Sequence, residues 1–336
     1  MPELRKDPVL GRWIIIAEER GKRPTDFIIA ESPTTGGFCP LCPGNESTTP
    51  QEVLAYGRQT GQGANTPGWK VRVVPNKYPA LVIEGELDRQ GEGLYDKMNG
   101  IGAHEVIIES PRHDDVFADL PPEQMLLVFK SFRDRIFDLE KDDRFRYVLV
   151  FKNFGKAAGA SLEHSHSQLV ALPILPRKIF SEMEGAISYY NYKERCVYCD
   201  IIRQEIQQEV RVVCQNEHFI TITPFAPRTP FEMWILPKEH NSAYHHENDS
   251  KLVSLTEIFS ESLCRLDACI PNVPYNFVLH TQPLRSDPLK HYHYHFEIVP
   301  KLTSIAGFEW GSGFYINPMP PEKASAYLRE SLERLS

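Results

Sequence analysis

The sequence has no apolar run of membrane length and no excess of positive charge. Lys and Arg total 37 against 45 Asp and Glu, which gives a formal net charge of −8 at pH 7. A general nucleic-acid-binding protein would be basic, so this balance argues against that class. The first twenty residues carry several charges and no signal-peptide pattern. We therefore expect a cytoplasmic protein with no nucleic-acid partner and no membrane contact.

Cysteine is scarce and odd in number, with seven residues in 336. Four of the seven form two C-x2-C pairs, and in a chain of this length without a secretion signal such pairs favour a metal over disulfides. Two distant histidines follow each pair, which completes the donor set of a tetrahedral S2N2 zinc site. The candidate ligands are Cys39, Cys42, His113 and His164 in the first set, and Cys196, Cys199, His240 and either His291 or His293 in the second.

The two ligand sets belong to a longer internal repeat. A shift of 127 residues carries His113 and His164 onto His240 and His291. Coincidence at such rare residue types is improbable, so we predict two copies of one α+β unit, each with a sheet and a helix. The spacing of the hydrophobic residues predicts the helices and strands of each copy. We expect helices at 121–141, 179–195, 251–266 and 320–335, strands at 12–17, 71–74, 105–109, 147–151, 233–236 and 275–279, and a division of the chain into 1–178 and 179–336.

One stretch, Gly159 to Pro173, concentrates the polar chemistry. Side chains two apart point the same way on a strand, so His164, His166 and Gln168 would share a face while the intervening serines point away. If His164 binds a metal, His166 is free to act, because a neutral imidazole is a good nucleophile toward phosphorus. Its Nδ1–H would be held by a carbonyl, and Gln168 would donate to a phosphate oxygen. Candidate phosphate partners are Arg20, Arg23, Lys152 and Lys156.

With these residues in place, the chain resembles the galactose-1-phosphate uridylyltransferase family of the histidine-triad (HIT) superfamily. The resemblance runs nearly end to end and implies a duplicated HIT-like α+β fold, with two antiparallel-sheet-plus-helix halves, and a homodimer. It rests on Arg5 to Pro8, Arg12-Trp13, Arg20 to Pro24, Cys39 to Cys42, Asn76 to Leu81, Asn153, Gly159 to Gln168, and Gly307 to Glu309.

The implied reaction is a ping-pong transfer. His166 would attack the α-phosphorus of UDP-glucose, and galactose-1-phosphate would then take the uridylyl group from the histidine. The implied partners are therefore a nucleotide sugar and a hexose-1-phosphate. By the same resemblance, the phosphates would contact Arg20, Arg23, Asn153, Gly159, Ser161 and Gln168, the nucleoside Asn76, and the sugar Phe308 and Glu309.

Two departures from the family pattern leave alternatives open. Ser165 stands where many members have proline, and His-Ser-His-Ser-Gln also resembles a branch that acts as an ADP-glucose phosphorylase. The first metal site would hold zinc, and the second zinc or iron. We favour Cys196, Cys199, His240 and His293 for the second site, because thiolates rarely recur at ligand spacing by accident, over the alternative set Glu182, His280, His293 and His295.

Two further functions compete with transfer through His166. A HIT-type hydrolase would use the second triplet, His291-x-His293-x-His295, with catalysis at His293. A zinc-stabilised nucleotide-binding module would use the histidines as ligands only. Loss of activity in His166→Gly separates the first alternative from transfer through His166, and capture of a covalent nucleotide separates the second.

Overall fold

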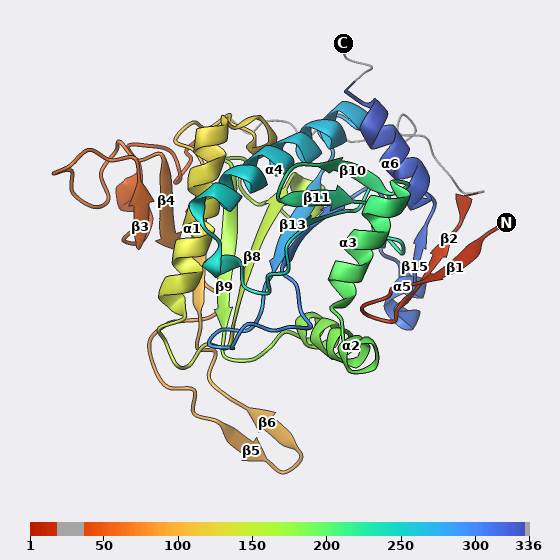
Figure 1. Cartoon of the computed structure of the whole chain (residues 1–336). Helices are drawn as coiled ribbons and strands as arrows, with labels where there is room; N and C mark the ends of the chain where they lie inside the picture. The colour runs from red at the N-terminus through yellow and green to blue at the C-terminus, as the bar shows by residue number, and fades with distance from the viewer. Residues whose placement is uncertain (19–36, 333–336) are drawn as a thin grey trace.

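A single ten-stranded sheet forms the frame of the molecule (Figure 1). The computed structural model describes residues 1–18 and 37–332. Every neighbouring pair in this sheet is antiparallel. The strands, in spatial order, are β10 (Val212–Gln215), β11 (Phe219–Ile222), β12 (Met233–Pro237), β14 (His295–Pro300), β13 (Tyr275–His280), β8 (Tyr147–Phe154), β9 (His166–Leu172), β7 (Ala103–Ile108), β4 (Val71–Pro75) and β3 (Leu54–Tyr56).

The order of the strands is symmetrical about the pair β8 and β13 at its centre. On one side the sheet continues through β9, β7, β4 and β3, and on the other through β14, β12, β11 and β10. The α+β fold with two antiparallel halves, expected from the sequence, is confirmed. The expected division at 178/179 falls in the first turn of α2 (Arg177–Lys193) and stays a prediction.

Two long helices, α1 (Pro122–Leu139) and α4 (Asp249–Cys269), run across one face of the sheet (Figure 1). Proline suits the first turn of α1, because its missing N–H has no helical partner there. The apolar residues of α1 recur at helical spacing and are buried at Met125, Phe129, Phe132 and Ile136. Phe129 of α1 and Phe259 of α4 each meet Phe296 of β14 edge to face, which places the main core between the two helices and the sheet.

The opposite face of the sheet is covered by different elements in its two halves. Over β11 and β12, α2 and α3 (Val197–Gln208) pack an apolar cluster that includes Val197, Ile202 and Trp234. Over β4 and β7, a loop takes their place and buries Cys39 and Leu41. The sequence pattern did not predict α3, because its first turn contains the second cysteine pair, which was assigned only as a ligand motif.

The remaining elements lie at the margins of the sheet (Figure 1). Among the described residues, no helix combines the length and the apolar character needed to cross a membrane. The expected C-terminal helix at 320–335 is observed as α6 (Pro321–Glu330) and ends earlier than predicted. The marginal elements are β1 (Glu3–Lys6), β2 (Trp13–Ile16) and β15 (Tyr315–Asn317) in one small sheet, the hairpin of β5 (Gln90–Glu92) and β6 (Tyr95–Lys97), and the helices α5 (Gly307–Ser312) and α6 (Pro321–Glu330).

Candidate active site

The strand β9, next to β8 in the sheet, begins at His166, the residue expected to be the nucleophile. Its Nδ1 lies 2.8 Å from the backbone carbonyl of His164. A carbonyl only accepts, so Nδ1 carries the proton and Nε2 keeps a free lone pair. The ring is buried, and burial, followed by the charge of Lys152, lowers the pKa of His166. This is the tautomer that the sequence analysis required for attack on phosphorus.

Both serines that flank His166 point to the other face of β9, where they meet a buried carboxylate. Ser165 Oγ donates to Glu109 Oε2 and Ser167 Oγ donates to Glu109 Oε1, each at 2.5 Å. Lys152 Nζ donates to the same carboxylate at 2.5 Å, to Ser165 Oγ at 3.1 Å and to the His166 carbonyl at 3.1 Å. The network fixes the backbone on both sides of His166.

This network corrects the expectation for Lys152. The sequence analysis named it as a phosphate partner, but its side chain is 2% exposed, and all three donors of its ammonium group have partners within the fold. Burial lowers the pKa of Lys152, while Glu109 opposes that effect. Lys152 therefore supports the strand instead of facing a ligand.

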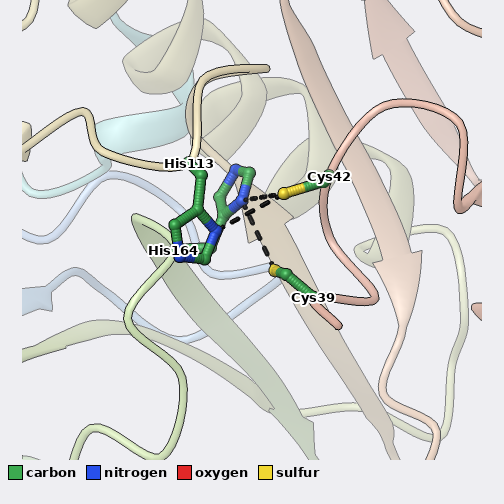
Figure 2. Close-up of side chains that lie close together, drawn as sticks. All are labelled: Cys39, Cys42, His113 and His164. Atoms are coloured by element: carbon green, nitrogen blue, oxygen red, sulfur yellow. Dashed lines mark hydrogen bonds between the residues drawn. The ribbon is translucent and has the colours of Figure 1, made fainter. Parts of the chain in front are cut away.

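Four sulfur and nitrogen donors converge beside His166, and Figure 2 shows them at close range. Cys42 Sγ lies 3.4 Å from His113 Nδ1 and 3.5 Å from His164 Nδ1, and Cys39 Sγ lies 3.7 Å from His164 Nδ1. In a tetrahedral zinc site, sulfur and nitrogen ligands are about 3.6 Å apart. His164 Nε2 donates to the Ser110 carbonyl at 2.8 Å, which leaves Nδ1 unprotonated for a metal. These residues can hold a metal ion.

A second cluster repeats this arrangement in the other half of the sheet. Cys199 Sγ lies 3.4 Å from His240 Nδ1 and 3.7 Å from His293 Nδ1, and Cys196 completes the group. Hydrogen bonds with Cys196, and then with the two histidines, lower the pKa of the Cys199 thiol to about 3. His291 contributes its carbonyl to Cys196 and is not part of the cluster.

The structure corrects the register of the repeat. His164 Nε2 bonds the Ser110 carbonyl, and His293 Nε2 bonds the Pro237 carbonyl, so His293 is the counterpart of His164. These two histidines are 129 residues apart, whereas His113 and His240 are 127 apart. The loop between β13 and β14 is therefore two residues longer than its counterpart, and the shift of 127 does not hold for the histidine triplet.

The counterpart of His166 is His295, whose Nδ1 bonds the His293 carbonyl at 3.0 Å. His295 is 1% exposed and packs against Tyr198 of α3 and against Trp234. Burial, followed by the charge of His280, lowers the pKa of His295 to about 4. This second copy of the position is therefore enclosed by residues of α3 and β12.

The alternative metal set is only partly assembled. Glu182, His280 and His295 come together with Glu297, but His293 points its Nδ1 to the cysteine cluster instead. Glu182 Oε2 lies 3.0 Å from His280 Nδ1, and Glu297 Oε2 accepts hydrogen bonds from two cationic side chains. Glu182 is buried, with 2% of its surface exposed.

The predicted substrate residues fall into three groups. Asn153, Gly159, Ser161 and Gln168 lie on β8, on β9 or in the loop between them, and Asn76 follows β4. Arg20 and Arg23 lie outside the described residues. Phe308 and Glu309 lie on α5, beside β15 and away from β9 (Figure 1), so they do not join the other residues within one chain. Every substrate role stays a prediction.

The sequence analysis missed His104, which orients Gln168. His104 Nδ1 accepts from the Ala80 N–H at 3.1 Å, so Nε2 carries the proton and donates to Gln168 Oε1 at 2.9 Å. The Gln168 amide is thereby turned with its NH2 group free to donate. Asn76 Nδ2 lies 3.2 Å from His104 Nε2, and both residues line a cavity of about 1290 Å³. On the paired strands, His104 lies opposite Val170 and diagonal to Gln168, so only the register of β7 against β9 brings the two side chains together.

The missed carboxylate, Glu109, had a signal in the sequence. It follows the apolar run Val106 to Ile108, and Lys152 interrupts the apolar strand β8 in the same way. Opposite charges in two strands of one sheet indicate a buried pair, because a single buried charge is too costly.

Comparisons with known proteins agree with this geometry. A family model described as "Galactose-1-phosphate uridyl transferase, N-terminal domain" matches residues 1–176, and a "Domain of unknown function (DUF4921)" model matches residues 118–336. ADP-glucose phosphorylase from Arabidopsis thaliana is 37% identical over 98% of this chain and 93% of its own length. Galactose-1-phosphate uridylyltransferase from Thermotoga maritima is 28% identical over 98% of this chain and 99% of its own length.

The solved structures give the same result. The crystal structure of the Arabidopsis thaliana ADP-glucose phosphorylase with bound ADP-glucose has a TM-score of 0.84 and 35% identity, and the match covers 98% of this chain and 99% of that one. A uridylyltransferase structure has a TM-score of 0.77 and 30% identity, with 100% and 99% covered. The chain therefore belongs to the galactose-1-phosphate uridyl transferase family of nucleotidyltransferases.

Proposed function

We propose that His166 carries the nucleotidyl group in a two-step transfer. The observation that supports this most directly is the hydrogen bond from its Nδ1 to the His164 carbonyl, which leaves Nε2 as the nucleophile. The serines on either side hold the backbone through Glu109, so the ring is preorganised for attack.

In the first step, Nε2 attacks the α-phosphorus of a nucleoside diphosphate glucose. A P–N bond forms, the P–O bond to glucose-1-phosphate breaks, and glucose-1-phosphate leaves with the electron pair. In the second step, a phosphate oxygen of the acceptor attacks the same phosphorus, and the imidazole leaves. Gln168, turned by His104, would donate to a phosphate oxygen as charge develops there. Glucose-1-phosphate leaves as a phosphate in the first step, and His166 leaves in the second step as a neutral imidazole whose Nδ1 keeps its proton, so neither step requires a strong general acid.

We favour ADP-glucose as donor and inorganic phosphate as acceptor, with ADP and glucose-1-phosphate as products. The more similar of the two relatives described above, at 37% identity, is an ADP-glucose phosphorylase. The motif His164-Ser165-His166-Ser167-Gln168 also resembles that branch. Uridylyl transfer from UDP-glucose to galactose-1-phosphate, the first expectation from the sequence, is the second candidate. It is supported by the Thermotoga maritima relative, which matches over nearly its whole length.

Zinc is the metal we propose for both cysteine clusters, because two thiols and two imidazoles at these separations suit its tetrahedral preference. When bound, zinc would tie the loop of Cys39 and Cys42 to His113 and His164. This chain's own contribution is to fix the backbone of His164, whose carbonyl holds His166. The predicted homodimer and the cytoplasmic location also remain proposals.

The test is capture of the covalent intermediate on the whole chain. The protein is mixed in turn with ADP-glucose and UDP-glucose without acceptor, kept at alkaline pH because phosphohistidine is acid-labile, and analysed by intact mass and peptide mapping. We expect one AMP per chain on the peptide that contains His166, with equal release of glucose-1-phosphate. A UMP adduct would instead support the second candidate.

Two variants complete the test. His166→Gly is expected to abolish the adduct, whereas His291→Gln, whose side chain lies outside both cysteine clusters, is expected to keep it. An adduct that persists in His166→Gly would assign catalysis to the second triplet. Failure of both nucleotide sugars to label the wild-type chain would overturn the proposed function.

A further inference from the structure

A fourth group of ligand-type side chains shares no residue with the other three and lies where the end of α1 meets the short helix Tyr244–His246. Glu140, His245 and His246 each place one ligand atom within 4.8 Å of the others. Glu140 is the C-cap of α1, which comes just before β8 in the chain. The two histidines follow β12, which belongs to the half of the sheet that contains β13. Nothing in the proposed transfer reaction uses these residues.

His245 is the observation that points to a ligand. Its side chain is 0% exposed, and neither ring nitrogen has a hydrogen-bond partner among the described residues. A buried polar group without a partner costs about 1–3 kcal/mol. Nε2 is aimed at Glu140 Oε2 at 3.6 Å, which is too long for a hydrogen bond. An imidazole nitrogen and a carboxylate oxygen that share a tetrahedral metal are about 3.4 Å apart.

The surroundings hold the carboxylate in place for a cation. Glu140 Oε1 accepts the Arg285 N–H at 2.7 Å, so its second oxygen is directed to His245. Carboxylates that bind metals usually accept a hydrogen bond of this kind from a neighbouring group. Tyr244 OH donates to the Phe129 carbonyl at 2.8 Å and keeps the short helix against α1. His246 is exposed, which gives an ion access from solvent and leaves room for water as a further ligand.

We propose that Glu140, His245 and His246 bind a divalent transition-metal ion, with zinc the best match to two imidazoles and one carboxylate. The ion joins the end of α1 to the loop after β12 and so links elements from the two sides of the central β8–β13 pair. It is a structural site, separate from His166, and it does not depend on the proposed reaction.

The test measures metal content on the whole, untagged chain. After equilibration with excess zinc and dialysis, wild-type protein should hold one more zinc ion per chain than His246→Gln, by plasma mass spectrometry. Glu140→Gln, which keeps an oxygen for the Arg285 N–H, should weaken this extra site by at least about tenfold in a zinc titration. His218→Gln, a control outside every cluster, should match the wild type.

Cobalt substitution identifies the donors. Cobalt bound at the two cysteine clusters gives intense thiolate-to-metal absorption, whereas cobalt at Glu140, His245 and His246 adds only weak visible bands. We expect the weak bands to be lost in His246→Gln while the thiolate absorption is unchanged, with circular dichroism confirming that the variant is folded. Equal zinc content in the wild type, His246→Gln and Glu140→Gln would overturn the proposal, as would a cobalt spectrum that is the same in all three.

Discussion

Replacement of Lys152 by methionine tests whether the buried network behind His166 supports both the fold and the site. Methionine has a similar volume, but it removes the ammonium group that contacts Glu109, a carboxylate that is 0% exposed. Removal of one partner of a buried ion pair costs about 3–5 kcal/mol, because the remaining charge is left without compensation. We expect the free energy of unfolding of Lys152→Met to fall by that amount in a urea denaturation series.

Pairing Lys152→Met with Glu109→Gln supplies the internal control. The double variant has no buried net charge at this position, so we expect it to lose less stability than the two single variants combined, by about 2 kcal/mol or more. The first transfer step should still be slower in both variants that carry Lys152→Met, because the His166 carbonyl loses its donor. Single-turnover labelling measures that step directly.

Two results would refute the reasoning. A loss below about 1 kcal/mol in Lys152→Met would mean that the ammonium does not compensate Glu109, since a surface ion pair contributes no more than that. Strict additivity of the two single variants would mean that Lys152 and Glu109 act independently, in conflict with their 2.5 Å contact.

Three other perturbations follow from the geometry. His104→Phe removes the hydrogen bond that turns Gln168, worth about 1 kcal/mol, and should slow single-turnover labelling about fivefold. Chelation with EDTA should lower the melting temperature in calorimetry, with zinc restoring it, because metal binding contributes folding free energy. Burial alone would raise the pKa of Glu52, but hydrogen bonds from Arg58 and Arg72 bring it below its ordinary value of 4.5. Stability from this group is therefore present above pH 4.5 and lost as pH falls toward the folded pKa, so Glu52→Gln should show a shallower acid loss in urea titrations.

Much of the fold could be predicted from local patterns in the sequence. The apolar spacing from Met125 to Ile136 requires a helix, and α1 is observed within two residues of each predicted end. The two C-x2-C pairs with distant histidines were sufficient to group the four residues of the first candidate metal cluster, because few functions other than metal binding need that donor set.

The rest depended on contacts between distant segments. The repeat register failed at the second histidine triplet because loop length is set by the turn geometry between β13 and β14, which leaves no periodic signal. Lys152 was misassigned because the residues around a lysine in a strand do not indicate whether it forms a buried ion pair or contacts a ligand. The orientation of Gln168 by His104 depends on the pairing of β7 with β9, and pairing is a property of the whole sheet.

The joining of β8 to β13 has a consequence for any attempt to divide the chain. A fragment that ended at residue 178 would lose β13, which pairs with β8 from Val150 to Phe154, and would leave the backbone groups on that side of β8 open. Long bare strands of this kind recruit other strands, including those of neighbouring molecules. Such a piece, expressed alone, should precipitate or pair with itself, and co-expression with the missing partner piece should rescue it.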